Sequence, residues 1–218
     1  PILDTVNDLS VTGWGYGASA GILYKPLTWL SIGGNYRSKI KKTLDGNVAF
    51  AANGTHAATL AGEILPTLIT GGIAVKPMEK LTVAASYDFE RNSEIETLTV
   101  TVPDLGASLP NVYNYKNSHT IHFGAEYWVR EPLALRFGYA KDLNNSIPDA
   151  VMNRIVGDIA AHELSLGLAY KWDRYTVAGT WNARFGSRTI PVSGVTNVAP
   201  GNYAAFVQAI SLGIGVSL

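Results

Sequence analysis

The stretch that decides the fold is IHFGAEYWVREPLALRFGY, residues 121–139. Apolar side chains occupy every second position on both sides of a short break at residues 130–132. A β-strand sends alternate side chains to opposite faces, so this pattern predicts two strands joined by a tight turn, each with one apolar face. What covers that apolar face decides between a soluble protein and a membrane protein.

The same alternation continues along most of the chain, with Gly, Ser, Asn or charged residues between the apolar positions. We therefore expect an all-β, antiparallel, up-and-down sheet of nine strands. The predicted strands cover residues 14–24, 30–40, 69–75, 81–89, 121–129, 133–139, 164–172, 175–185 and 206–218.

The composition narrows the class of protein. Charged residues make up 16% of the chain, below the roughly 25% usual in soluble domains. The 17 basic and 17 acidic residues cancel, so the basic surface expected of a nucleic-acid-binding protein is missing. No apolar run is long enough for a transmembrane helix, which leaves a β-barrel as the only way this sequence could span a membrane.

Two features favour a membrane barrel over a soluble β-sandwich. Charged side chains alternate to the face opposite the apolar one, and Lys or Arg facing lipid at the bilayer midplane would cost about 2–4 kcal/mol. Aromatic residues gather at the strand ends, as in the girdles of outer-membrane barrels. These aromatic residues are Trp14, Tyr24, Tyr87, Phe89, Tyr127, Tyr139, Tyr170, Trp172, Tyr175 and Phe185.

The connections alternate in length. Short turns are predicted at residues 25–28, 76–80, 130–132 and 173–174, and long links around 50–66, 103–117, 144–160 and 190–203. Outer-membrane barrels have short periplasmic turns, longer outer loops and, in bacteria, an even number of strands. Nine strands is odd, so we expect residues 1–218 to be a single barrel domain that is the C-terminal part of a larger barrel.

Three phrases and their order carry a resemblance to a known family. They are WGYGASAGILYKPLTWLSIGGNYRSKIK (14–41), HFGAEYWVREPLALRFGYAKD (122–142) and HELSLGLAYKWDRYTVAGTWNARF (162–185), with Ser146–Asp149 as a short Pro-Asp element between the last two. The chain resembles the FadL/TodX family of outer-membrane transporters for long-chain fatty acids and aromatic hydrocarbons. The resemblance covers nearly the whole chain.

The resemblance implies a fourteen-stranded barrel in the bacterial outer membrane, plugged by an N-terminal hatch. The nine strands would be the sixth to fourteenth of that barrel, and the hatch and the kinked gating strand have no counterpart here. The implied function is passive uptake of hydrophobic compounds. The expected partners are a hydrophobic small molecule and membrane lipid or detergent, with no nucleic acid, and we expect a monomer.

Side chains inferred to face the lumen are the first candidates for ligand contact. An arginine there could hold a carboxylate through charge-assisted hydrogen bonds, or it could be paired with the acids beside it. One histidine and one glutamate on the same strand could form a proton-linked or metal pair, or a structural hydrogen bond. The candidates are Arg37, His122, Glu126, Arg136, Glu163 and Arg184.

Apolar residues in the long links form a second group of candidates. They could line a funnel that captures hydrophobic molecules, or they could pack on one another and cap the barrel. The group comprises Leu109, Tyr113, Tyr115, Met152 and Ile155.

Other functions remain as alternatives to a hydrophobic-compound channel. A porin for polar solutes would need a wide, charged opening, and a structural or adhesin barrel would need long hydrophilic outer loops. The chain lacks G-x-S-x-G, H-E-x-x-H and Gly-rich phosphate-loop motifs, so we expect no enzyme, no catalytic residues, no cofactor and no metal site.

Overall fold

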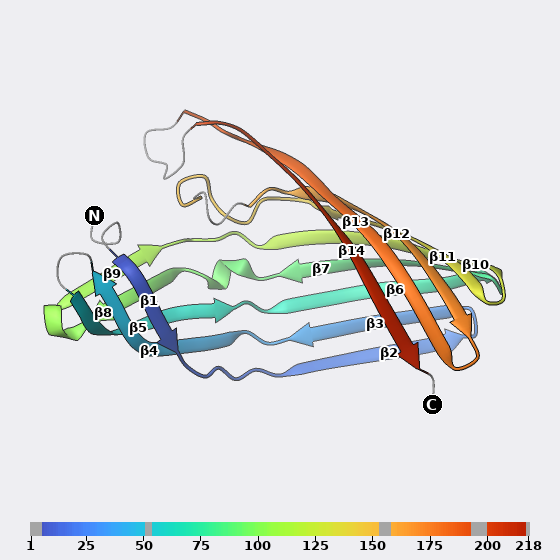
Figure 1. Ribbon diagram of the computed structural model, residues 1–218, viewed down its shortest axis with the longest axis horizontal. Coiled ribbons are helices and arrows are strands. Elements are labelled where there is room, and N and C mark those ends of the chain that lie inside the picture. Colours follow the sequence, from blue (N-terminus) through green and yellow to red (C-terminus); the bar gives the residue numbers. More distant parts are fainter. Residues whose placement is uncertain (1–5, 51–53, 153–157, 193–199, 217–218) are drawn as a thin grey trace.

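The computed structural model describes residues 6–50, 54–152, 158–192 and 200–216. It consists of antiparallel strands in two sheets, with short 3-10 helices at η2 (Asn92–Glu94) and η3 (Pro103–Leu105) (Figure 1). Among the described residues there is no helix with the length and apolar character needed to cross a membrane. The strands are β1 (Val6–Thr12), β2 (Ser19–Leu27), β3 (Leu30–Arg37), β4 (Ile40–Phe50), β5 (Gly54–Leu65), β6 (Leu68–Met78), β7 (Leu81–Glu90), β8 (Thr97–Val102), β9 (Ala107–Val112), β10 (Ser118–Arg130), β11 (Leu133–Asp142), β12 (Ala161–Trp172), β13 (Tyr175–Ile190) and β14 (Gly201–Val216).

The larger sheet confirms the nine strands predicted from alternation. Its order is β2-β3-β6-β7-β10-β11-β12-β13-β14, with every neighbouring pair antiparallel. Two-residue turns at 28–29, 79–80, 131–132 and 173–174 close its hairpins at one end. The first predicted turn was placed too early, because β2 continues through Pro26 to Leu27.

The cross-strand register defines two faces of this sheet. Directly paired residues share a face, and one such row is Tyr127, Leu135, Leu168, Gly179 and Leu212. We call this side the apolar face. The adjacent row lies on the other side, the polar face, and consists of Glu126, Arg136, Gly167, Thr180 and Ser211.

The prediction that residues 50–66 and 103–117 are links without strands is wrong for Phe50 and residues 54–65 of the first and for residues 107–112 of the second. These residues belong to a second sheet of five strands in the order β1-β4-β5-β8-β9, which we call the extension. Each of its strands continues along the chain from a strand of the larger sheet, in the same order, so the extension prolongs that sheet at the end opposite the two-residue turns (Figure 1). These five strands therefore do not complete a barrel.

The predicted strand at 14–24 begins later than expected, at Ser19. Residues 13–18 run against β4, and a Cβ atom added at Gly13, Gly15 or Gly17 would clash with Thr43, Lys42 or Ile40. The glycines therefore allow close approach to β4. The intervening Trp14 and Tyr16 are strongly exposed.

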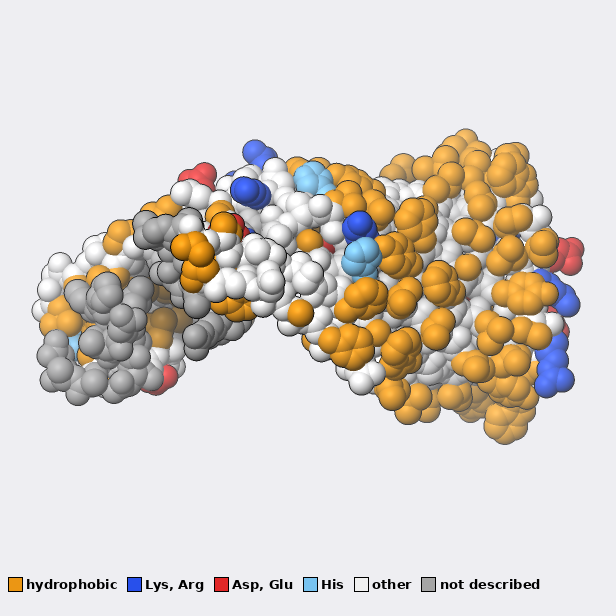
Figure 2. Space-filling model, turned by 90° about the horizontal axis from the view of Figure 1, so that it is seen from above, with side chains coloured by type: hydrophobic (Ala, Val, Ile, Leu, Met, Phe, Trp, Pro, Cys, Tyr) orange, Lys and Arg blue, Asp and Glu red, His pale blue; other side chains and the backbone are white. Residues whose placement is uncertain are grey.

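The two sheets differ in how far their apolar side chains are buried. The extension packs them together into a buried core of Val48, Phe50, Ala58, Leu60, Val100 and Val102. On the larger sheet the apolar face stays uncovered: Phe123 is 49% exposed, Leu166 52% and Leu212 84%. Figure 2 shows this surface as a broad field of hydrophobic side chains.

Candidate functional site

The six predicted lumen-facing residues lie together on the polar face. Glu126 is directly paired with Arg136, and Glu163 with Arg184. The register extends this relation across the sheet, because a strand shifted by one residue would turn all its side chains to the other face. The residues that the structure places on this face include Arg37, His122, Glu126, Arg136, Glu163 and Arg184.

Two of the three arginines form close ion pairs with carboxylates of the same face. Arg136 Nε donates to Glu126 Oε2 at 2.7 Å. Arg184 donates to Asp142 and also lies 3.7 Å from Glu163 Oε2. All these groups remain partly exposed, so the pairs are worth little in stability. Their main effect is to neutralise the charge of this wall.

A looser group lies across β3, β7 and β10. Arg37 is 3.8 Å from Glu90, and His122 Nε2 is 3.2 Å from Asp88 Oδ2. Within the described chain, the buried atoms Arg37 Nε, Asp88 Oδ1 and His122 Nε2 make no hydrogen bond, because His122 Nε2 is within ion-pair distance of Asp88 Oδ2 but is not aligned with it as a hydrogen bond requires. Buried polar atoms are costly when unsatisfied, so this group is suited to hold water or the polar end of a ligand.

The predicted link between His122 and Glu126 is not formed. His122 approaches Asp88, whereas Glu126 accepts hydrogen bonds from Arg136 and from Trp128 Nε1. The described residues contain no cluster of three or more His, Asp or Glu side chains that could hold a metal ion.

A hollow of about 570 Å³ lies beside this polar group. Most of its lining residues belong to the polar face, His122, Asn35 and Thr70 among them. Much of its lining on the polar face is small and uncharged, which leaves room for a molecule against the sheet. The small residues are Gly33, Gly72, Ala74, Ala84, Ser86 and Gly124.

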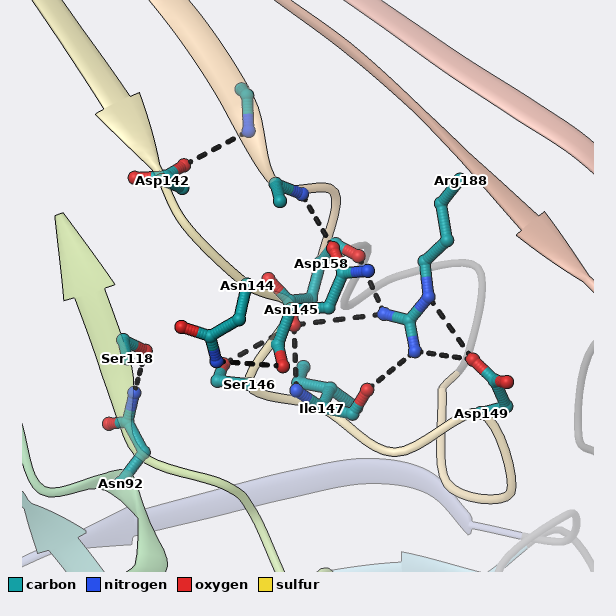
Figure 3. A network of polar contacts seen from close by, with 12 residues as sticks. Asn92, Ser118, Asp142, Asn144, Asn145, Ser146, Ile147, Asp149, Asp158 and Arg188 are labelled. Atoms are coloured by element: carbon teal, nitrogen blue, oxygen red, sulfur yellow. Dashed lines mark hydrogen bonds and ion pairs between the residues drawn. The ribbon is translucent and has the colours of Figure 1, made fainter.

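A second network closes the outer end of the polar face, where β11 leads into β12. Arg188 is almost fully buried and donates to Asp149 Oδ1 at 2.6 Å, to the Ile147 carbonyl at 2.6 Å and to the Asp158 carbonyl at 2.7 Å (Figure 3). Asp158 in turn accepts the Ile147 N–H at 2.6 Å. We call these four residues the rim latch, because they fasten the β11–β12 link to β13.

Sequence reasoning missed Arg188 because the predicted strand ended at residue 185, whereas β13 continues to Ile190. The available signal was its spacing: Arg188 lies four residues after Arg184, so a longer strand puts both on one face. The resemblance did single out Ser146–Asp149, and this Pro-Asp element supplies two members of the rim latch.

Two of the predicted apolar loop residues pack under the rim latch. Met152 is buried with Ile147 and Ile190, and Tyr115 packs against them. Burial raises the pKa of the Tyr115 hydroxyl, and the nearby Tyr113 and Asp158 raise it further.

The remaining loop candidates also contact protein. The Tyr113 ring lies 5.3 Å from the Tyr115 ring, and its hydroxyl accepts a hydrogen bond from Asn111. Leu109 packs on the core of the extension. Ile155 lies outside the described residues. The four described candidates therefore all contact neighbouring segments, and their contact with a hydrophobic ligand stays a prediction.

A further group, unnoticed in the sequence, sits where the extension meets the larger sheet. Glu94 accepts hydrogen bonds from the Thr67 N–H and hydroxyl, both at 3.0 Å, and lies 3.4 Å from Lys39 Nζ. Burial alone would raise its pKa, but the Thr67 and Lys39 contacts outweigh burial and hold the pKa below its usual value. Glu94 thus joins the links β3–β4, β5–β6 and β7–β8.

Comparison with known proteins assigns the chain to a family. The chain belongs to the outer membrane protein transport protein family (OMPP1/FadL/TodX), whose model matches residues 2–193. It is 25% identical over 184 residues to an outer-membrane protein of Neisseria meningitidis serogroup B, covering 68% of this chain and 38% of that protein. The family and this relative assign the chain to the bacterial outer membrane.

Solved structures agree on the fold. A FadL homologue of Pseudomonas aeruginosa is similar over 91% of this chain and 50% of its own, with a TM-score of 0.67 and 19% identity. The Ralstonia pickettii toluene transporter TbuX is similar over 94% of this chain and 49% of its own, with a TM-score of 0.68 and 18% identity. The CymD monoaromatic hydrocarbon channel is similar over 95% of this chain and 52% of its own, with a TM-score of 0.64 and 16% identity. The chain thus spans about half the length of these structures.

Proposed function

We propose that this chain forms part of the wall of an outer-membrane channel for passive uptake of hydrophobic compounds, such as aromatic hydrocarbons or long-chain fatty acids. The observation that carries the proposal is the hollow of about 570 Å³ on a face whose arginines are paired with carboxylates. An apolar molecule there gains about 25 cal/mol for each Å² that it buries, so no energy source is needed. Two of the similar structures are named as a toluene transporter and a monoaromatic hydrocarbon channel.

The charge pattern favours neutral hydrocarbons over carboxylates. A fatty acid head group would have to compete with Glu126 for Arg136, or with Asp142 and Glu163 for Arg184. The loosely paired group of Arg37, Asp88 and His122 could accept a hydroxyl or water more easily than an anion, because it contains a carboxylate of its own.

Liposome uptake with a matched pair of variants tests this proposal. Gly124 lines the hollow on the polar face, so we expect Gly124→Leu to reduce naphthalene uptake several-fold by filling it. Gly71 lies on the apolar face with no atom within 4 Å of an added Cβ, and Gly71→Leu should leave uptake unchanged. Equal effects of the two variants would contradict a passage along the polar face.

The choice of solute separates the alternatives. A hydrophobic-compound channel should admit naphthalene much faster than glucose. Comparable glucose entry would indicate a porin for polar solutes, and entry of neither would indicate a structural barrel.

We also propose that further strands close this sheet into a barrel, with fourteen as the expected number. Within the described residues, β2 pairs only with β3 and β14 only with β13, and lipid does not tolerate such open edges. If β2 and β14 instead closed on each other, cysteines at Gly21 and Gly213 would cross-link in the membrane. We expect no such cross-link.

A further inference from the structure

The outer end of the apolar face carries the same three-residue arrangement twice. The Tyr87 hydroxyl lies 2.5 Å from His119 Nδ1, and the Tyr139 hydroxyl lies 2.8 Å from His162 Nδ1. Each histidine also faces a phenylalanine of the adjacent strand: Phe89 lies 5.3 Å from His119, and Phe185 is stacked on His162 at 5.6 Å. Each imidazole ring thus contacts a tyrosine hydroxyl and a phenylalanine ring, one on β7–β10 and the other on β11–β12–β13.

Lys141 lies between these two histidines, on β11. It is directly paired with Ile121 of β10 and with His162 of β12, so it shares their apolar face. Its presence corrects the expectation that all charged residues avoid this face. No ion-pair partner of Lys141 occurs among the described residues. We call His119, Lys141 and His162 the basic rim cluster.

The carboxylates next to the basic rim cluster lie on the polar face. Asp142 and Glu163 are neighbours of Lys141 and His162 in sequence, so they lie on the polar face, where both approach Arg184. On the apolar face, the basic rim cluster is therefore not neutralised by the strands that carry it.

The basic rim cluster marks one border of the apolar face. Figure 2 shows histidine and basic side chains where the field of hydrophobic side chains ends. All three residues lie at the ends of β10, β11 and β12 that are remote from the two-residue turns. Short turns of such barrels face the periplasm, so the basic rim cluster lies at the head-group level of the outer leaflet. A lysine is well tolerated at that depth, unlike at the bilayer midplane.

We propose that the basic rim cluster binds the phosphate of an anionic lipid in the outer leaflet. Lys141 supplies a positive charge and up to three donors. Each histidine can add one donor: when the tyrosine hydroxyl donates to Nδ1, the proton resides on Nε2, and Nε2 has no partner among the described residues of either histidine.

The apolar face beneath the basic rim cluster suits the acyl chains of the same lipid. Phe123, Phe137 and Leu166 lie on the same strands farther from the outer end, and all three are about half exposed. A phosphate at the border and acyl chains below it match this succession from basic to apolar surface. The inference does not depend on what the channel transports.

Native mass spectrometry of the purified protein in neutral detergent tests the inference with phosphatidic acid and phosphatidylcholine of identical acyl chains. We expect preferential retention of phosphatidic acid. Lys141→Gln should weaken it about fivefold, as expected for about 1 kcal/mol per basic residue near a membrane surface. Lys80→Gln, at the opposite end of the strands in a two-residue turn, is the matched control and should have no effect.

Two further measurements make the outcome decisive. His119→Phe with His162→Phe keeps the aromatic rings but removes both Nε2 donors, and should also weaken phosphatidic acid binding. A competition with inorganic phosphate distinguishes a free ion from a lipid: we expect no displacement at lipid-equivalent concentrations. Equal binding of the two lipids, equal effects of Lys141→Gln and Lys80→Gln, or full displacement by inorganic phosphate would each overturn the proposal.

Discussion

The larger sheet and the extension share the same strand path and the same alternation, yet they bury different amounts of apolar surface. In the extension, Val48 and Val102 are at most 1% exposed because they pack in one hydrophobic core. In the larger sheet, Leu166 and Leu212 are 52% and 84% exposed. The period of a strand therefore tells which side chains share a face but does not tell what covers that face.

Side-chain type separates the two regions better than periodicity does. The extension strands contain no Trp or Tyr and are rich in Thr, Ala and Val, as in TLTVTV of β8. The larger sheet places Trp172 and Tyr175 at one end of its apolar face and Tyr87 and Tyr139 toward the other. Aromatic residues at both borders are typical of a surface that meets lipid.

The largest expected effect comes from a charge placed in the middle of the apolar face. Leu166→Arg should lower the free energy of unfolding in liposomes by about 2–4 kcal/mol, the cost of arginine near the bilayer midplane. Val112→Arg, on a half-exposed residue of the edge strand β9 in the extension, should change it by no more than about 0.5 kcal/mol. Urea titration followed by tryptophan fluorescence measures both.

A neighbouring residue on the same strand provides the control for Leu166→Arg. Ser165 lies on the polar face, paired with Gly138 and Asn182, so Ser165→Arg should be tolerated much better. If all three arginine variants cost the same, lipid does not cover the apolar face.

Enlarging a small side chain should destabilise the extension but not the larger sheet. Ala58 is 3% exposed inside the core of the extension, and Ala58→Leu should destabilise that region by about 1–3 kcal/mol through overpacking. Gly71→Leu projects into open space on the apolar face, where lipid can adapt, and should not destabilise the protein. Hydrogen exchange of β5 and β6 amides reports each effect locally, and protection lost in β6 would contradict this comparison.

Alternation predicted the larger sheet because large apolar residues mark its strands, as in Phe123, Tyr127 and Leu135. In β5 it failed because alanines on both faces obscure the alternation, as Ala57, Ala58 and Ala61 do. Pro103, Gly106 and Pro110 are also residue types typical of turns and loops, which argued against a strand here. Pro110 is nevertheless compatible with a strand, because β9 is an edge strand and needs no donor on its outer side.

The polar face could be predicted as a set of residues, but its pairing could not. Arg136 and Glu126 follow from the two strands of one hairpin, so their contact is readable once the turn is placed. Arg184 and Asp142 belong to strands that are not neighbours in the sheet order, and no local pattern brings them together. The same applies to Glu94, whose partners Thr67 and Lys39 come from distant links.

Glu94 gives the smallest and most specific test, because it holds the two regions together through its charge. Its pKa in the folded protein lies below the usual 4.5, so the unfolded chain binds more protons between the two values. The stabilisation from Glu94 is therefore fully present above about pH 4.5 and is lost as pH falls through the folded value. We expect the amides at Thr67 and Ile95 to lose hydrogen-exchange protection over that window.

Glu94→Gln should reduce this protection modestly at neutral pH and abolish its dependence on acid, because glutamine still accepts a hydrogen bond but carries no charge. Thr67→Val removes only the hydroxyl donor at 3.0 Å. That variant should raise the pKa of Glu94 and move the loss of protection to higher pH. If Glu94→Gln kept the wild-type acid dependence, another carboxylate would have to join the extension to the larger sheet, and the two regions would be coupled elsewhere.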